Sequence, residues 1–378
     1  MLSVLLISSK LVYGQDSVQT QKALEIRGYV KNMQAITFTK NFEDNVSSNL
    51  LHNRINVRWN PVGKLSGAAE FRNRLIWGEE VRTIPGYADL LENQNEAFDM
   101  AYRWISKSNL ILHTNVERLW LEYRTEKWNT RIGRQRINWG MTTIWNPNDI
   151  FNTYNFLDFD YEERPGSDAI KFSYLLGDMS NVEVAAAAAS ESKNTVAAIK
   201  YFTNKWNYDF QFSGGVYQEI VTLGTGWSGS INNTGFKGEL QYFFANDSAG
   251  QFNMTLEADY IFEKSWYLNV GMLFNSYGIT RPVETLDLTT FQLSPQNLMP
   301  TKWNAAVTVT KEFTPLLSGN LSVIYAPGTN LMILLPGLKY NLATNIDFDL
   351  IWQSFFAEQQ NTFESVMHRG FLRVKWNF

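Results

Sequence analysis

The chain has 378 residues and a formal net charge of -4, which is too near neutral to indicate a nucleic-acid partner. It contains no cysteine, which excludes disulfide scaffolds, thiolate metal sites and thiol catalysis. Aromatic residues make up 15% of the chain, yet no apolar run approaches the roughly 18 residues that a membrane helix needs.

The N-terminus carries a short apolar segment that ends in small residues. Val12 and Gly14 stand at the spacing of a signal-peptide cleavage site, so residues 1–14 are predicted to be a secretory signal. Residues 15–23 would then be a short periplasmic segment. Because a basic n-region is missing and Lys10 interrupts the apolar segment, a disordered tail stays open as the alternative.

From residue 24 to the end, apolar and polar residues alternate in segments of strand length. The wall of a transmembrane barrel requires this alternation, because lipid-facing and lumen-facing residues take turns along each strand. We therefore predict an all-β fold, a single antiparallel transmembrane β-barrel over residues 24–378 with about 18 strands, or 16 if the segments rich in Ala or Gly at 180–191 and 219–230 are not strands. The predicted strands are 24–39, 50–60, 65–79, 112–124, 127–138, 168–176, 180–191, 194–203, 206–218, 219–230, 233–244, 252–262, 266–278, 301–313, 317–326, 330–340, 343–355 and 367–378.

The connections between these strands alternate in length. Long ones fall at 40–49, 80–111, 139–167, 279–300 and 356–366, and all are odd-numbered, whereas the short turns are even-numbered. With a periplasmic N-terminus, the long connections are extracellular, as in outer-membrane barrels. Within 80–111, residues 88–105 are expected to form a short amphipathic helix.

Charged residues on the polar faces of the strands segregate by sign around the predicted lumen. A basic wall is expected from Arg27, Lys31, Arg54, Arg58, Arg72, Arg74, Arg118, Arg124, Arg134, Arg136, Arg369, Arg373 and Lys375. An acidic wall is expected from Glu183, Asp209, Glu239, Glu257, Asp259, Asp347 and Asp349. Rows of Arg and Lys favour anions in a channel, although the same charges could pair with one another and fill the barrel.

The loop 139–167 combines aromatic side chains with carboxylates. Its apolar content is costly in water, so we expect the loop to fold inward, pack and narrow the pore. Its carboxylates would then face the basic wall; they are Asp149, Asp158, Asp160, Glu162 and Glu163.

The last strand ends the chain on Phe378, and in this it resembles the terminal strand of bacterial outer-membrane barrels. A second resemblance lies in short motifs between 131 and 166. They are R-x-G-x-Q (Arg131, Gly133, Gln135), WG (Trp139, Gly140), an N-P-x-D turn (Asn146, Pro147, Asp149) and R-P-G (Arg164, Pro165, Gly166). In these motifs the chain resembles porin-like outer-membrane barrels, including alginate-export-type and related uncharacterised families. The resemblance implies an outer-membrane channel fold and no particular substrate.

The predicted function is a passive channel of the bacterial outer membrane for small polar or anionic solutes. The alternative is a non-conducting barrel subunit of a larger assembly for secretion, uptake or biogenesis. No enzymatic role is expected, because His52, His113 and His368 have no recognisable serine partner. An energy-coupled transporter would need a plug domain, for which a first strand at residue 24 leaves no room.

Neither a metal nor any other cofactor is expected, since no His/carboxylate cluster shows ligand spacing. Expected partners are outer-membrane lipid and lipopolysaccharide, other outer-membrane proteins and small polar solutes, with no nucleic acid.

Overall fold

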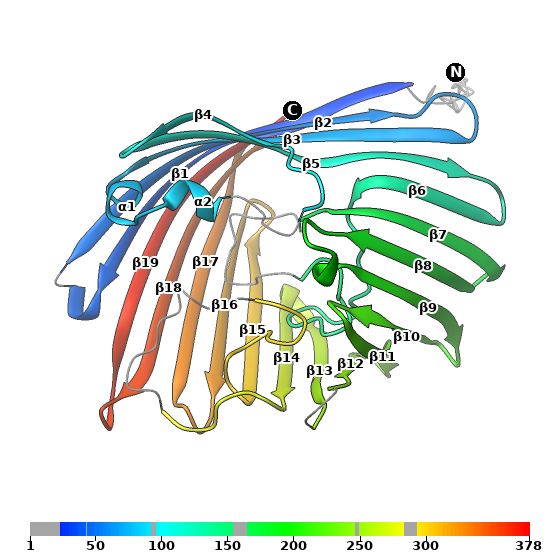
Figure 1. The fold of residues 1–378 in the computed structure, drawn as a ribbon. Helices are drawn as coiled ribbons and strands as arrows, with labels where there is room; N and C mark the ends of the chain where they lie inside the picture. Colours follow the sequence, from blue (N-terminus) through cyan, green and yellow to red (C-terminus); the bar gives the residue numbers. More distant parts are fainter. Residues whose placement is uncertain (1–22, 43, 92–95, 154–164, 246–248, 283–292) are drawn as a thin grey trace, which may run out of the picture.

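The computed structural model describes residues 23–42, 44–91, 96–153, 165–245, 249–282 and 293–378, and these form a barrel of long strands (Figure 1). The strands are β1 (Leu24–Thr39), β2 (Asn45–Trp59), β3 (Leu65–Gly78), β4 (Ala101–Lys107), β5 (Leu110–Arg124), β6 (Trp128–Gln135), β7 (Ser167–Gly177), β8 (Ser180–Ala188), β9 (Val196–Lys205), β10 (Tyr208–Tyr217), β11 (Ile220–Ile231), β12 (Thr234–Phe243), β13 (Gln251–Phe262), β14 (Trp266–Asn275), β15 (Trp303–Thr314), β16 (Leu317–Ala326), β17 (Leu331–Ala343), β18 (Ile346–Gln359) and β19 (Thr362–Asn377). The helices are α1 (Glu79–Thr83) and α2 (Tyr87–Leu90), with 3-10 turns η1 (Lys40–Phe42), η2 (Ser192–Asn194) and η3 (Glu263–Ser265). In this part of the chain, no helix is long and apolar enough to cross a membrane.

Eighteen strands, β1–β3 and β5–β19, form one closed antiparallel sheet. Each pairs with the next of these strands along the chain, and β1 pairs with β19, with Val30 opposite Trp376, to close the ring. Closure removes the free edges that a sheet would otherwise expose in a bilayer. The prediction of an 18-stranded all-β barrel is confirmed.

The remaining strand, β4, completes the wall where β6 stops short. The C-terminal part of β5, Leu119–Arg124, pairs with β6. Its N-terminal part, Leu110–Asn115, pairs with β4. Both parts pair with β3 on the other side. The expected helix over 88–105 is wrong, because α2 ends at Leu90 and 101–107 is a strand.

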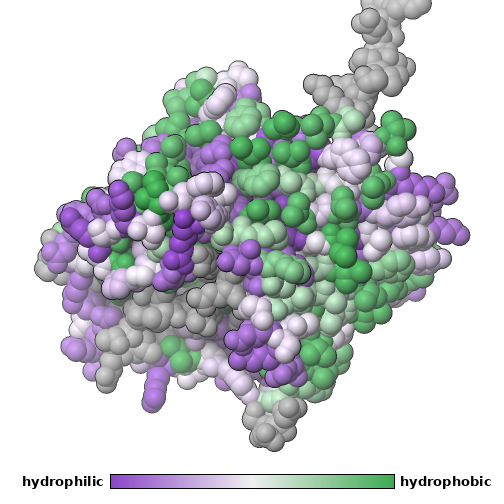
Figure 2. Space-filling view, turned by 45° about the horizontal axis from the view of Figure 1, so that its top comes forward, coloured by the Kyte–Doolittle hydropathy of each residue, from purple (hydrophilic) through white to green (hydrophobic). Residues whose placement is uncertain are grey.

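The outer face of the barrel is apolar, as the alternation predicts. Exposed side chains on it include Leu223, Val270, Leu321 and Leu350, and apolar side chains spread widely over the face seen in Figure 2. Tryptophans cluster where strands meet the short turns, as the aromatic girdle of a membrane barrel requires. Examples are Trp59, Trp206 and Trp266.

Three long connections, 79–109, 136–166 and 276–302, leave the same end of the barrel. Two others predicted to be long are short, since β2 begins at Asn45 and the β18–β19 turn consists of Gln360 and Asn361, both with positive φ. The strands there extend farther than the apolar–polar alternation indicated. Above the bilayer both faces of a strand meet water, so pairing can continue without alternation.

Candidate functional site

The extracellular half of the barrel interior is filled by connections that fold inward. Under α1 and α2, Val81 and Ala88 pack on Leu50, Ile76 and Phe371. A second apolar cluster joins Trp139 and Ile150 to the inner faces of β7–β10 and β12. A third joins Trp145, Leu298 and Met299 to the inner faces of β14–β18. The first two clusters each fix one connection inside the barrel, and the third fixes parts of both 136–166 and 276–302.

The segment 136–153, which includes the first part of the loop 139–167, is held on the acidic wall by its backbone N–H groups. The Glu239 carboxylate, on β12, accepts hydrogen bonds from the backbone N–H groups of Met141, Thr142 (2.7 Å) and Asn148 (2.9 Å) and from the Thr142 hydroxyl. Glu257, on β13, accepts from Thr143 N–H at 2.8 Å and Ile144 N–H at 2.7 Å. These buried carboxylates therefore bind the loop rather than line an open passage.

Two neighbouring side chains extend this attachment. Glu183 accepts a hydrogen bond from the Trp139 indole, and the Gln211 amide donates to the Trp139 carbonyl at 2.6 Å. Glu183 also pairs with Lys171 and Lys200, so its charge is balanced within the wall. The loop thus contacts β8, β10, β12 and β13.

Small residues on the inner wall make room for the segment. A Cβ added to Gly226 would lie 3.0 Å from the Met141 sulfur, and one added to Gly271 would lie 2.9 Å from Ile144. On β8, Ala185 and Ala187 are buried against the cluster that contains Trp139. The Ala-rich β8 and the Gly-rich β11, the two segments whose strand assignment was open in the sequence, therefore form part of the surface on which the loop packs.

Below the inward connections, two adjoining hollows of about 530 and 430 Å³ open inside the barrel. They share Arg58, Glu70, Arg118 and Arg136, and one of them reaches the short turn at Pro61. Together they are lined by seven cationic side chains, Arg27, Arg58, Lys64, Arg118, Arg124, Arg131 and Arg136, and by the carboxylates of Glu25, Glu70 and Glu122. The periplasmic half of the lumen therefore carries an excess of positive charge, and we call it the basic cavity.

Five of the predicted basic-wall residues line this cavity: Arg27, Arg58, Arg118, Arg124 and Arg136. The sequence-based assignment missed Arg131, whose guanidinium bonds to Glu122 (Nε–Oε2 2.8 Å) and lies 4.0 Å from the Trp120 ring centroid. Because Arg131 and Arg134 are three residues apart on β6, they face opposite sides of the wall. The sequence did contain a signal that Arg131 faces the lumen, because Asn129 and Arg131 are two residues apart and therefore lie on the same, polar face of β6.

The other basic-wall residues lie outside the basic cavity and are bound by partners of their own. Arg54 pairs with Glu70 at 2.6 Å, Arg72 lies 3.6 Å from Glu117, and Arg373 binds Asp349 at 3.0 Å. Others contact the inward connections or neighbouring aromatic rings: Arg74 donates to the Leu91 carbonyl at 2.9 Å, Arg369 lies 3.6 Å from Glu80 of α1, and Lys31 and Lys375 lie over Tyr29.

The rest of the acidic wall is bound locally. Asp259 pairs with Lys237 at 2.9 Å, Asp347 with Lys339 at 3.4 Å, and Asp209 accepts from the Asn204 amide at 2.8 Å. Of the predicted loop carboxylates, Asp149 is fully buried. Asp158, Asp160, Glu162 and Glu163 lie outside the described residues, as does the predicted signal 1–14.

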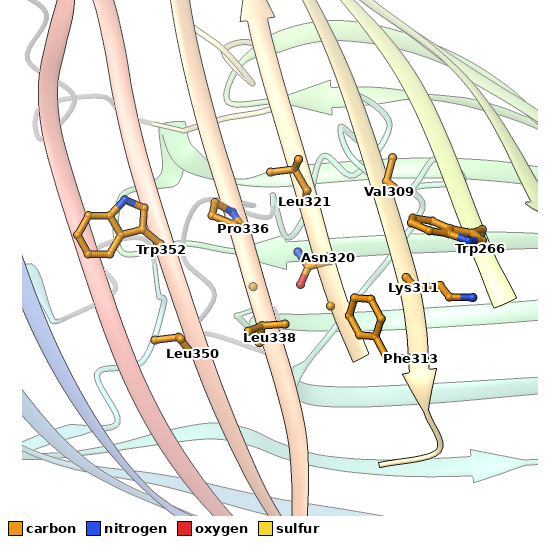
Figure 3. Close-up of a pocket in the computed structure, with 12 residues that line it drawn as sticks. Trp266, Val309, Lys311, Phe313, Asn320, Leu321, Pro336, Leu338, Leu350 and Trp352 are labelled. Carbon is orange, nitrogen blue, oxygen red and sulfur yellow. The ribbon is translucent and has the colours of Figure 1, made fainter. Parts of the chain in front are cut away.

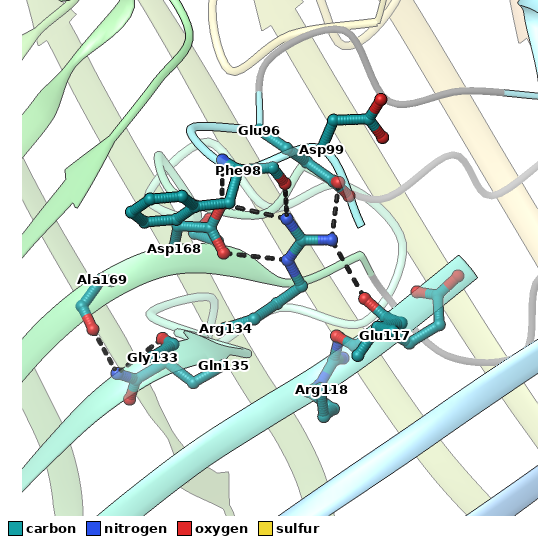
Figure 4. A network of polar contacts seen from close by, with 12 residues as sticks. Glu96, Phe98, Asp99, Glu117, Arg118, Gly133, Arg134, Gln135, Asp168 and Ala169 are labelled. Carbon is teal, nitrogen blue, oxygen red and sulfur yellow. Dashed lines mark hydrogen bonds and ion pairs between the residues drawn. The ribbon is translucent and has the colours of Figure 1, made fainter. Parts of the chain in front are cut away.

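Arg134 does not line the basic cavity (Figure 4). It lies in what we call the seam, the place in the wall where β6 ends at Gln135 beside the start of β7 at Ser167. Its guanidinium binds Asp168 of β7, the Val116 carbonyl of β5 and the carboxylate of Glu96 (2.6 Å). The Asp168 carboxylate in turn accepts the Phe98 N–H at 3.0 Å. One buried cation thus joins three strands to the connection that crosses the seam.

These features define the class of protein: a closed barrel with an apolar outer band, a charged interior and long connections at one end is a porin-like barrel of the bacterial outer membrane. Within the described ranges, no group of three or more His, Cys, Asp or Glu side chains could hold a metal ion. Neither a known family model nor a curated protein matches the sequence.

Several solved structures share this fold. OccAB4 of Acinetobacter baumannii aligns with a TM-score of 0.59 at 10% identity, covering 95% of this chain and 99% of that one. The outer-membrane protein OpdK of Pseudomonas aeruginosa gives 0.59 at 8% identity over 94% and 98% of the two chains. OccK8 (OprE) of Pseudomonas aeruginosa gives 0.58 at 9% identity over 94% and 98%. At such identities the likeness shows the fold, and it supports the porin-like part of the resemblance but not its alginate-export-type part.

Proposed function

We propose that this barrel is a passive outer-membrane channel for small polar or anionic solutes, narrowed by the inward-folded loop 139–167. The observation that carries this proposal is the basic cavity. Its seven cationic side chains outnumber its three carboxylates, and it opens toward the short-turn end, below the inward connections.

Electrostatics in such a cavity favour small anions. The outer wall and the bilayer have a low dielectric constant, which focuses the field of the Arg side chains into the lumen and raises the local anion concentration. Arg58 and Arg136 are exposed to the lumen and line both hollows. They are the cations that we expect a passing solute to meet.

The attachment of the 136–153 segment supports a fixed constriction. Its backbone N–H groups bind Glu239 and Glu257 at 2.7 to 2.9 Å, in addition to the Met141 N–H that Glu239 accepts. A segment held through its backbone keeps its path when its side chains vary. We infer that it sets the minimum width of the passage.

The test is single-channel recording in planar bilayers, with the reversal potential measured across a KCl gradient. The wild-type protein should form small channels with mild anion preference. Arg58→Gln and Arg136→Gln should each reduce that preference, and the double variant should reduce it further. Arg82→Gln, in α1 and outside the basic cavity, is the matched control and should leave the reversal potential unchanged. Unchanged selectivity in the double variant would refute the role of this cavity.

A second candidate function is a non-conducting subunit of a larger outer-membrane assembly. The three apolar clusters that fill the extracellular half of the interior favour it. Zero conductance together with stoichiometric co-purification of other outer-membrane proteins would establish this alternative. Lipopolysaccharide, as the lipid facing the extracellular half of the wall, is the further partner we propose in either case.

A further inference from the structure

A hollow of about 500 Å³ lies on the outer wall of the barrel, away from the lumen, and crosses β14–β18 (Figure 3). Its lining side chains are apolar except at Lys311 and Asn320: Trp266, Val309, Phe313, Leu321, Pro336, Leu338, Leu350 and Trp352. Elsewhere on such a wall, adjacent side chains pack into a convex surface. A concave apolar groove that faces the bilayer therefore needs a specific explanation.

Two residues create the groove. Gly319 has no side chain on the outer face, and a Cβ there would lie 2.9 Å from Phe313 and 3.1 Å from Leu338. Pro336 has no N–H to donate, and the β17–β18 pairing is interrupted between Leu334 and Gly337. The wall is thinned at these two positions, on neighbouring strands.

The groove has one polar end. Lys311 faces outward on β15, opposite Trp266 of β14, and its ammonium lies 5.3 Å from that ring. Among the described residues, neither the Lys311 ammonium nor the Trp266 indole N–H has a hydrogen-bond or ion-pair partner. At the other end, the Trp352 indole donates to Ser354 at 2.8 Å. Two donors at the Trp266 end, the Lys311 ammonium and the Trp266 indole N–H, are thus available to a ligand.

The polar end lies near the membrane surface and the apolar end lies deeper. Lys311 is three residues from Thr314, where β15 ends at a short periplasmic turn, which places it about 7 Å inside the strand end at the usual strand tilt. Trp352 is six residues from Ile346, the periplasmic end of β18, or about 14 Å inside it. A lipid-facing lysine is far less costly near the interface than at the midplane of the bilayer.

We propose that this groove binds a phospholipid of the periplasmic leaflet. One acyl chain lies along Leu321, Leu338 and Trp352, and the headgroup phosphate accepts hydrogen bonds from the Lys311 ammonium and the Trp266 indole. Charge complementarity and depth both favour this occupant. A second copy of the barrel would present a convex wall of similar side chains, which cannot enter a hollow as a flexible acyl chain can.

Native mass spectrometry of the full-length barrel in detergent, titrated with phosphatidylglycerol, tests the proposal. One phosphatidylglycerol should bind per wild-type chain. Lys311→Gln should weaken that binding about five- to tenfold, as expected for one lysine at a lipid phosphate. Leu321→Trp should fill the groove and abolish it. A diacylglycerol, which lacks the phosphate, should bind wild type and Lys311→Gln equally weakly.

The matched control is Lys205→Gln. Lys205 lies 4.9 Å from the Trp206 ring at another periplasmic turn, outside the groove, so its loss should leave binding at the wild-type level. Equal binding by wild type, Lys311→Gln and Leu321→Trp would overturn the proposal. So would a dimer that Leu321→Trp converts to monomer with no change in bound lipid, because the groove would then be an interface between copies. Neither result depends on whether the barrel conducts.

Discussion

Arg134 and Asp168 form a bidentate ion pair with Nε–Oδ1 and Nη2–Oδ2 distances of 2.8 and 2.9 Å, and their side chains are 0% and 5% exposed. The pair joins the end of β6 to the start of β7, at the place where the chain leaves the wall for the interior. Arg134 and Asp168 are also opposite each other in the β6–β7 strand pairing, so the ion pair reinforces that pairing at the point where it ends.

Replacement of Arg134 should destabilise the barrel. Arg134→Leu leaves the carboxylates of Asp168 and Glu96 buried without their cation, and breaking a buried pair in this way costs about 3–5 kcal/mol. Urea unfolding from lipid vesicles, followed by tryptophan fluorescence, measures the loss. Arg136→Gln, in the basic cavity, should change the unfolding free energy by less than about 0.5 kcal/mol. Equal stabilities of the two variants would show that the pair does not hold the seam.

Release of the loop should follow from Glu239→Gln. The amide keeps one oxygen but turns an NH₂ group toward a site where backbone N–H groups also point, so donors face donors. Because the natural chain has no cysteine, Ile150→Cys gives a single label site in a buried part of the loop. Maleimide should modify it several-fold faster in the Glu239→Gln background, and single-channel conductance should rise.

Asp259→Asn is the control for that experiment. Asp259 lies on β13, two residues from Glu257, and accepts no backbone N–H from the described residues of the loop. It pairs with Lys237, whose ammonium lies 3.4 Å from the Thr143 hydroxyl. Its replacement should leave the labelling of Ile150→Cys slow. Fast labelling in this variant, or slow labelling in Glu239→Gln, would contradict the attachment described above.

Stability should depend on pH through Glu96, which lies in the connection before β4 and outside the membrane-spanning strands. Burial raises the pKa of Glu96 to about 7, against the opposing effect of the Arg134 charge. The folded protein therefore binds this proton more tightly than the unfolded chain, whose carboxyl has its ordinary pKa of 4.5. The stabilising contribution is complete below about pH 4.5 and is lost as the pH rises through about 7.

The size of this effect is at most about 3 kcal/mol for a shift from 4.5 to about 7. Urea unfolding between pH 5 and pH 8 measures it in lipid vesicles. Glu96→Gln stays neutral throughout, so its stability should fall less over that range than that of the wild type. Parallel curves for the two proteins would exclude Glu96 as the source.

Most strand positions could be predicted from the sequence, because the bilayer forces the side chains of each spanning strand to alternate. The prediction 65–79 and the observed β3 (Leu65–Gly78) differ by one residue. Alternation fails outside the bilayer, which is why β2 and β19 begin earlier than predicted. The seven residues of β4 fit a helical period as well as a strand period, and pairing with β5 decided between them.

It was harder to predict which side chains of β6 face the lumen. Gly133 adopts a φ of +112°, and a Cβ there would lie 2.2 Å from the Leu119 carbonyl. After this irregularity the chain places Arg134 in the seam and turns inward to place Arg136 in the basic cavity. A glycine inside a strand is a signal for such a change, but it does not reveal which way the next side chain points.

By itself, the sequence determined the closed barrel, its apolar outer band and the end that carries the long connections. These follow from a period of two and from turn lengths, which are local properties. Only the tertiary structure decided what each charge does. Glu239 holds a loop segment some 90 residues away in the chain, Arg134 binds Asp168 at the seam, and Arg58 lines the basic cavity. The apolar–polar alternation shows which face of a strand a charged residue occupies, but it does not show which distant residue becomes its partner.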